Sequence, residues 1–252
     1  MKLSLLSLLC AAWAASPGLP SFAQDYHTND LTPPGAGSGK LAASSSGKQA
    51  GSSLAAGAYS PHAFVSSGNA LNTVDLNPAS AYYSMAFCMD DTQQGGWAYF
   101  PTGIHATVWS GTAASCVDLN PSGFNFSYCY GIDHGEQAGY AQQQSYFVTA
   151  SHAFVWHGSA ASGVDLHFGT YPFSRALGCR SGEQAGYVST IAYGEGEQLG
   201  YHTGSRAVRW AGSAASGVDI HPAGFDSSEA TCTNGTQQGG WGYTASGTSH
   251  QH

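Results

Sequence analysis

Charged residues are scarce in this sequence. Asp, Glu, Lys and Arg make up 9% of the 252 residues, and only seven of these are Lys or Arg. Nucleic-acid binding needs clustered cations that neutralise phosphates, and anionic lipids repel a protein whose formal net charge is −8. We therefore expect neither nucleic acid nor an anionic membrane surface as a partner.

Long apolar runs are absent beyond the N-terminus. Leu3–Ala15, after Lys2, is too short to span a bilayer and resembles the apolar part of a secretory signal, with a small-x-small cleavage site at Ser21–Ala23. We expect residues 1–23 to be a signal peptide and the mature protein to be secreted or held at the cell surface, with no membrane span. Residues 24–41, rich in Pro, Gly and Ser, are expected to form a disordered linker.

The composition also differs from that of a helical bundle, which uses many Glu, Lys, Leu and Arg residues. The sequence instead contains 34 Gly and 12% aromatic residues. Gly together with Tyr, Trp, Phe, Val, Ser and Thr is typical of short strands joined by tight turns. The composition therefore favours an all-β fold.

One long pattern occurs four times. It reads HAFVWHGSAASGVDL at His152–Leu166 and recurs at His105–Leu119, at Arg206–Ile220 and, less closely, at His62–Leu76. In each copy an Asp lies thirteen positions after the first residue, and the copies start at 62, 105, 152 and 206. A repeat period of about 40 to 45 residues is typical of propeller blades with four strands each.

A shorter pattern alternates with the long one: GEQAGY at Gly135 and Gly182, GEQLGY at Gly196, and TQQGGW at Thr92 and Thr236. One period then predicts four strands: an Ala-containing strand, the Gln-x-Gly-Tyr strand, His-Ala-x-Val-Trp and Gly-Val-Asp-Leu. In the third of these, large and small side chains alternate. A sheet covered on both faces by neighbouring sheets would have this pattern.

The predicted fold is an all-β, β-propeller-like domain over residues 42–252, with four blades of about four short antiparallel strands. The count rises to five if Ala42–Ser52 and the extra GEQLGY module are counted separately. The tail after Glu229 supplies only a first and a second strand, and the His62 copy a third and a fourth, so joining the two ends would complete one blade and protect its edges. A competing interpretation is that Ser249-His250 opens another repeat and that the gene product is truncated.

The linked signatures His-Ala-Phe-Val-Trp, Gly-Ser-Ala-Ala-Ser-Gly-Val-Asp-Leu and Gly-Glu-Gln-Ala-Gly-Tyr resemble the bacterial extracellular HAF-repeat family over roughly Ala42–Tyr243. His-Ala-Phe itself occurs at His62 and His152, and the sequence departs from it at Thr107 and at Arg206–Val208. The resemblance implies export and a propeller-type repeat. It implies no activity and no catalytic residues.

The His, Trp and Asp of each long repeat have two interpretations. A His with an Asp could form a general base and its orienting group. A residue set that occurs once per blade, however, is better explained by hydrogen bonds that hold the blade together, and Arg at position 206 cannot act as a neutral base. We therefore assign a structural role to His62, Asp75, His105, Trp109, Asp118, His152, Trp156, Asp165, Arg206, Trp210 and Asp219.

Other motifs with known chemistry are missing. No metal-ligand spacing, nucleophile elbow or phosphate-binding loop occurs, so we expect no metal and no cofactor. The recurring Glu136 and Glu183 are interpreted as solvated turn residues rather than as glycosidase carboxylates. Without Cys10 of the signal, five Cys remain, an odd number, and Cys116 with Cys129 is a candidate disulfide. The alternative for these Cys is a role as small buried residues.

The function expected from these observations is that of an exported, non-enzymatic binding scaffold for a glycan, a peptide or another cell-surface component. The alternative is an exported hydrolase or lyase with a site near the propeller axis, for which Arg175, Arg180 and His134 are the candidates. The scaffold predicts ligand contact at the loops after each Val-Asp-Leu, unless their rings pack between blades. The aromatic residues there are Tyr82, Tyr83, Phe124, Phe126, Tyr171, Phe173 and Phe225.

Overall fold

The computed structural model describes residues 31–144, 149–190, 204–244 and 249–251. The expected signal peptide lies outside these residues, as does most of the extra GEQLGY module. The described residues form nineteen β-strands and four three-residue 3-10 turns, with no α-helix among them. The prediction of an all-β fold is therefore confirmed. None of the helical segments described is long and apolar enough to cross a membrane.

The strands follow one another in five antiparallel units. Unit 1 contains β1 (Ala36–Ser45), β2 (Lys48–Ala55), β3 (His62–Ser66) and β4 (Thr73–Asp75). Unit 2 contains β5 (Tyr83–Met89), β6 (Gln94–Phe100), β7 (Gly103–Trp109) and β8 (Val117–Asp118). Unit 3 contains β9 (Phe126–Asp133), β10 (Glu136–Gln144), β11 (Thr149–Trp156) and β12 (Val164–Asp165).

Units 4 and 5 continue this order. Unit 4 contains β13 (Phe173–Arg180), β14 (Glu183–Ser189), β15 (Ser205–Trp210) and β16 (Val218–Asp219). Unit 5 contains β17 (Ser227–Thr233), β18 (Gln238–Tyr243) and β19 (Ser249–Gln251). The 3-10 turns η1 (Ala70–Asn72), η2 (Ala113–Ser115), η3 (Ala160–Ser162) and η4 (Ala214–Ser216) precede the fourth strands of units 1 to 4.

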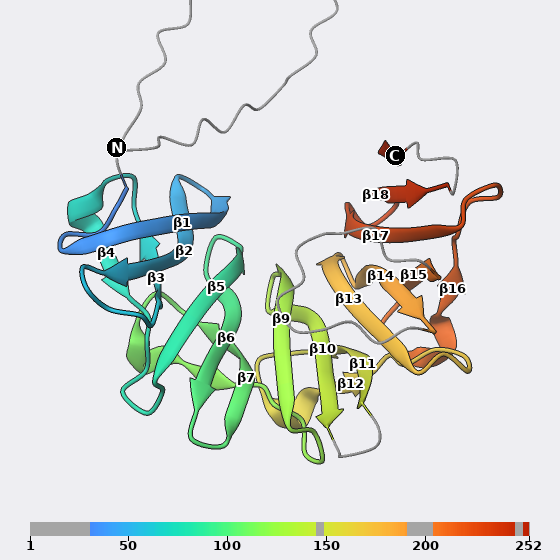
Figure 1. Cartoon of the computed structure of the whole chain (residues 1–252), viewed down its shortest axis with the longest axis horizontal. Helices are drawn as coiled ribbons and strands as arrows, with labels where there is room; N and C mark the ends of the chain where they lie inside the picture. The colour runs from blue at the N-terminus through green and yellow to red at the C-terminus, as the bar shows by residue number, and fades with distance from the viewer. Residues whose placement is uncertain (1–30, 145–148, 191–203, 245–248, 252) are drawn as a thin grey trace, which may run out of the picture.

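The units are arranged as an open arc (Figure 1). The first and last units lie on either side of the opening, and β5, β9 and β13 lie on the inner side of the arc (Figure 1). A single parallel pairing, Ser151 with Phe173, joins units 3 and 4 into one sheet. No sheet is closed, and no described strand of unit 5 pairs with unit 1.

Two details of the expected organisation are corrected. The four-bladed ring completed by joining the two ends is not formed, because the His62 copy has its own first and second strands, β1 and β2, and β19 supplies a third strand on β18. The β1 strand also begins at Ala36, inside the expected linker. Its side chains are mostly exposed, so the strand depends on backbone pairing with β2 and leaves no apolar pattern in the sequence.

A β-bulge interrupts the first strand of every unit at the same place, for example between Ala176 and Gly178 in β13. Opposite the residue before each bulge lies a glycine of the second strand. A Cβ on that glycine would come within 1.9 to 2.0 Å of a backbone carbonyl oxygen of the first strand. The five glycines are Gly51, Gly96, Gly139, Gly186 and Gly240. The last Gly of the short signature is thus required because the backbones of the first and second strands approach closely at this position.

The apolar cores lie between consecutive units. The small residues on one face of a third strand pack with the Trp on the third strand of the next unit: Val65 with Trp109, Val108 with Trp156 and Val155 with Trp210 occupy common clusters. The alternation of large and small residues along these strands therefore covers each sheet on both faces. Between units 4 and 5 the core is smaller, consisting of three Ala residues with Ile220 against them.

Candidate functional site

The His and Asp of each long repeat lie in contact. The Nδ1 atoms of His62, His105 and His152 lie 2.8, 2.6 and 2.6 Å from Oδ2 of Asp75, Asp118 and Asp165, and Arg206 Nε donates to Asp219 Oδ2 at 2.6 Å. Each pair joins the third and fourth strands of one unit. Because Arg replaces His without loss of the contact, the arrangement needs a donor at this position rather than a base.

Each pair also connects to the next unit. Asp165 Oδ1 accepts from the backbone N–H of His167, and His167 Nδ1 lies 2.9 Å from Ser174 Oγ. The same Ser Oγ accepts from the backbone N–H of Ala153. Ser84, Ser127 and Ser228 accept equivalent bonds across the other junctions. Burial raises the pKa of Asp165, but the bonds from His152 and His167 outweigh it, so the pKa lies below its usual value.

The three repeated Trp residues stabilise the units in a different way from the His–Asp pairs. Trp109, Trp156 and Trp210 are fully buried. Their Nε1 atoms have no hydrogen-bond acceptor within the described part of the chain. They therefore stabilise the junctions by packing rather than by the hydrogen bonds expected for a His-Trp-Asp set.

The recurring Glu residues are not solvated turn residues. The side chains of Glu136 and Glu183 are only 14% and 13% exposed. Glu136 Oε1 accepts from Gln184 Nε2 at 2.8 Å, and Glu183 Oε1 accepts from Gln238 Nε2 at 2.6 Å. Gln93 takes the same place toward Gln137. A carboxylate and an amide oxygen both accept this bond, which explains why Glu and Gln interchange at the position.

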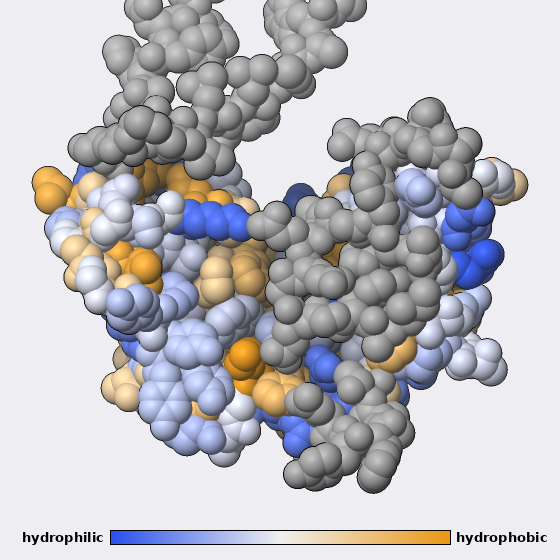
Figure 2. Space-filling view, viewed as in Figure 1, coloured by the Kyte–Doolittle hydropathy of each residue, from blue (hydrophilic) through white to orange (hydrophobic). Residues whose placement is uncertain are grey.

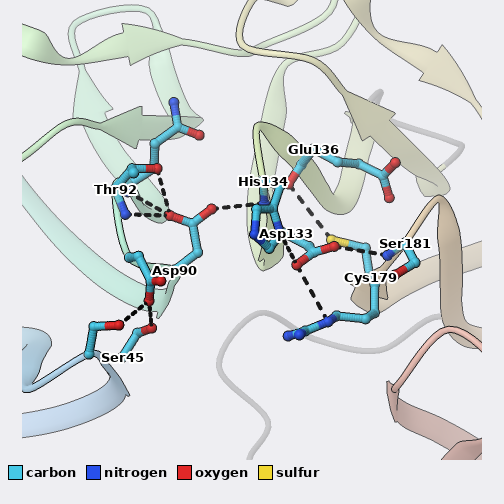
Figure 3. Close-up of polar contacts among 12 residues, drawn as sticks. Ser45, Asp90, Thr92, Asp133, His134, Glu136, Cys179 and Ser181 are labelled. Carbon is cyan, nitrogen blue, oxygen red and sulfur yellow. Dashed lines mark hydrogen bonds and ion pairs between the residues drawn. The ribbon is translucent and has the colours of Figure 1, made fainter.

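The turns between first and second strands link the units at a further point (Figure 3). Ser45 and Ser46 donate to Asp91, Asp90 accepts from the backbone N–H of His134, and Asp133 accepts from that of Ser181. Arg180 and His134, two candidates for the enzymatic alternative, contact Asp133 at 3.6 and 2.7 Å. These two residues therefore belong to a turn-to-turn contact.

The loop aromatics do not gather on one exposed surface. Phe173 is buried, Tyr171 packs against the core between units 3 and 4, and Phe124 packs on His152 and Phe154. Phe225 lies against Gly242, and Phe126 begins β9. Tyr82, at 60%, is well exposed. Of these rings, Tyr171, Phe124 and Phe173 pack into the fold and do not contribute to a shared exposed surface.

A continuous set of rings instead lies on the first and second strands of units 2 and 3. We call this set the aromatic row: Tyr83, Phe87, Trp97, Tyr128, Tyr130 and Tyr140. Phe87 and Tyr130, the two bulge residues, stack with centroids 5.2 Å apart at 14°. Trp97 lies 6.4 Å from Phe87 and 6.3 Å from Tyr128. Tyr128 and Tyr140 are buried, whereas the other four rings are partly exposed.

Arg175 extends the aromatic row into unit 4, and its guanidinium carbon lies 4.2 Å from the centroid of Tyr140. Glu229, at the same register in unit 5, is 2% exposed. Burial raises the pKa of Glu229 to about 8, against the charge of Arg175 and a hydrogen bond with Ser205. The equivalent positions, in unit order, are Lys40, Met85, Tyr128, Arg175 and Glu229.

Sequence reasoning missed Trp97 and Glu229 as site residues. Trp97 could have been found by aligning the short signatures, where it takes the place of Tyr140. Glu229 could have been found by aligning the first strands as Ser-x-Ala: Ser84-Met85-Ala86, Ser174-Arg175-Ala176 and Ser228-Glu229-Ala230. The middle position is the one that changes from unit to unit. This position on the first strand can therefore hold a different residue type in each unit without disturbing the repeat.

Cavities occur at the two end units. One of about 330 Å³ lies in unit 1 beside His62, Phe64 and Asp75. One of about 90 Å³ lies between units 4 and 5 beside Glu229 and along β18 at Gln238–Trp241, where β19 pairs with Trp241–Tyr243 alone. Among the described residues, the short third strand of unit 5 thus leaves Gln238–Gly240 of β18 paired with β17 on one side and with no strand on the β19 side.

The Cys residues are all free thiols in the described part of the chain. The expected Cys116–Cys129 pair is not made, because Cys116 packs with the core between units 1 and 2 and Cys129 with the core between units 2 and 3. Cys129 Sγ instead lies 3.9 Å from Cys88 Sγ. No cluster of three or more metal-ligating side chains is found among the residues described.

Comparisons of the chain with protein-family models, with curated proteins and with solved structures give no significant match.

The buried Glu229 predicts a pH-dependent stability. The carboxyl stays protonated in the folded protein up to about pH 8, whereas it ionises near 4.5 in the unfolded chain. Its contribution to the free energy of unfolding is therefore complete below pH 4.5 and is lost as the pH rises through 8. We expect the wild type to lose about 2–4 kcal/mol relative to Glu229→Gln between pH 5 and pH 9. Urea unfolding of both proteins at several pH values measures this difference. Equal dependence of the free energy of unfolding on pH in the two proteins would contradict the prediction.

Proposed function

We propose that this chain is a propeller-type binding scaffold in which the five units act as blades and the aromatic row contacts the ligand. The single observation that carries this proposal is the row itself. Partly exposed rings of Tyr83, Phe87, Trp97 and Tyr130 adjoin one another on the first and second strands of units 2 and 3. Aromatic surface of this kind with a few polar groups is typical of ligand sites.

The ligand class that fits best is a carbohydrate. Aromatic faces pack against the C–H faces of sugar rings, and the rings of the aromatic row lie along two units rather than in one deep cavity. On the coloured part of the visible surface, weakly polar and apolar residues alternate with strongly hydrophilic ones (Figure 2). The low share of charged residues in the sequence, 9%, suits an uncharged ligand. The N-terminal segment supports export, so the ligand would be met outside the cell or at its surface.

We expect the double substitution Phe87→Ala/Tyr130→Ala to weaken carbohydrate binding at least about tenfold, because central aromatic contacts carry most of the energy of such sites. Soluble β-glucan, xylan and chitin oligosaccharides are the probes, with a random peptide library as the second arm. Tyr59→Ala is the matched control, since Tyr59 is an exposed ring far along the chain from the aromatic row. Unchanged binding by the double variant, or binding to peptides alone, would contradict the proposal.

One observation favours an enzyme as the second candidate. Arg175 and Glu229, which differ from their counterparts in every other unit, come close enough that the charge of Arg175 acts on the pKa of Glu229. A carboxyl that is protonated near pH 7 can act as a general acid. The enzymatic alternative therefore expects Glu229→Gln to retain binding and to abolish hydrolysis of whichever polysaccharide binds. Retained hydrolysis would exclude this role.

A further inference from the structure

We propose that Cys88 and Cys129 form a disulfide that joins units 2 and 3 when the chain folds under oxidising conditions. Cys88 lies in β5 and Cys129 in β9, and both are buried. Their Sγ atoms are 3.9 Å apart. A disulfide bond brings its two sulfur atoms to about 2.05 Å, so bond formation would draw the two side chains together across the contact between β5 and β9.

A glycine makes room for the two sulfur atoms. A Cβ on Gly95 would lie 2.7 Å from Cys88 Sγ and 2.8 Å from Cys129 Sγ. Both thiols therefore occupy the space above this one residue of β6. A side chain at position 95 would press on both sulfur atoms, so Gly95 leaves the space in which the two thiols meet.

The sulfur atoms of the other thiols make different contacts, although Cys179 is close enough to Cys88 and Cys129 for their charges to interact. Cys179 Sγ lies 3.8 Å from the carbonyl oxygen of Glu136, and Cys232 Sγ lies 3.7 Å from that of Gly239. Cys116 packs with the core between units 1 and 2. Of the described cysteines, Cys88 and Cys129 are the pair whose sulfur atoms are in contact.

The reaction requires a low-molecular-weight disulfide as the oxidant. One Cys thiolate attacks this disulfide and releases one small thiol, which takes a proton, and leaves a mixed disulfide on the protein. The second Cys thiolate then attacks the protein sulfur and releases the second small thiol, so two protein thiols are oxidised and one small disulfide is reduced. The hydrogen bond to Cys129 and burial raise the pKa of Cys88, so this reaction is expected to be faster during folding than in the folded protein.

The bond would also fix the aromatic row. Phe87 and Tyr130 are the chain neighbours of Cys88 and Cys129, and they stack on each other across the same junction. A covalent link at this point holds the two rings at one spacing. The disulfide itself does not depend on the proposed function, whereas this consequence does.

The test is to refold the full chain with oxidised and reduced glutathione, denature it, alkylate the free thiols and measure the mass. We expect two fewer alkylated thiols than in the reduced protein. A chymotryptic digest should contain one linked pair of peptides, with Cys88 in one and Cys129 in the other. Chymotrypsin is suitable because Trp97, Tyr99 and Phe100 lie between the two residues, whereas no Lys or Arg does.

Variants and stability give the controls. Cys88→Ser should leave Cys129 alkylated, so that the oxidised and reduced samples of this variant carry the same number of alkyl groups, and Cys116→Ser should leave the linked peptides unchanged. The oxidised wild type should have a Tm roughly 5–15 °C above that of the reduced protein. Full alkylation after oxidative refolding would overturn the proposal, and so would linked peptides that contain Cys116 or Cys179. Peptide mapping of the wild type gives this answer even if a variant does not fold.

Discussion

Replacing Gly139 by Ala is expected to abolish the cooperative thermal transition of the chain. A Cβ at this position would lie 1.9 Å from the carbonyl oxygen of Tyr128 and 3.1 Å from Cα of Cys129. These are backbone atoms of the paired strand β9, so no side-chain rotation relieves the overlap. Strands β9 and β10 would have to separate, at a cost of at least about 4 kcal/mol.

Gly39→Ala is the matched control for this substitution. Gly39 also lies in a strand, and the nearest atoms to its added Cβ are at 3.7 and 4.0 Å, which is ordinary contact. We expect the control to change the Tm by only a few degrees. Thermal unfolding monitored by near-ultraviolet circular dichroism measures the transition of both variants. A Gly139→Ala protein with a near-normal Tm would show that the two strands do not approach as closely as described.

Replacing Trp156 by Ala is expected to lower the free energy of unfolding by about 3–5 kcal/mol. The indole is fully buried in the core between units 2 and 3, together with Val108 and Leu119 of unit 2. Its removal leaves a cavity that the two packed sheets cannot close. Urea unfolding monitored by the remaining Trp fluorescence gives the difference.

The companion variant Trp156→Phe separates packing from hydrogen bonding. Because Nε1 of Trp156 has no acceptor among the described residues, Phe should lose only part of the packed volume, at about 1–2 kcal/mol. If both variants lost the same free energy of unfolding, the indole N–H would have to contribute a hydrogen bond in addition to packing. The same comparison at Trp210 would test the next junction.

The repeats made much of this fold predictable. A period-two pattern with His, Phe and Trp alternating with Ala and Val predicts a strand covered on both faces, and β11 has this character. The position of the Asp, thirteen residues after the His, predicts a contact within the repeat, and the structure has one in each of units 1 to 4. Local pattern is sufficient in these cases because both partners belong to the same repeat.

The features that were missed depend on contacts between repeats or on the backbone. Strand β1 is held by pairing with β2 and has few buried side chains, so its composition resembles a linker. Glu136 accepts a hydrogen bond from Gln184, a residue of the next unit, and nothing in its own turn indicates this contact. The aromatic row arises because the bulges at Phe87 and Tyr130 bring two rings together. Bulge positions depend on strand register, which one sequence does not specify.

The open arc has a mechanical consequence. The extensive contacts join consecutive units only, so the molecule behaves as four elastic junctions in series. Small rotations at each junction add, which makes the spacing between the first and last units its most compliant dimension. A force applied between the two ends would act on every junction. The extension of the molecule would then be the sum of the extensions of the four junctions. The junction between units 4 and 5, with its small Ala-lined core, would set the rupture force.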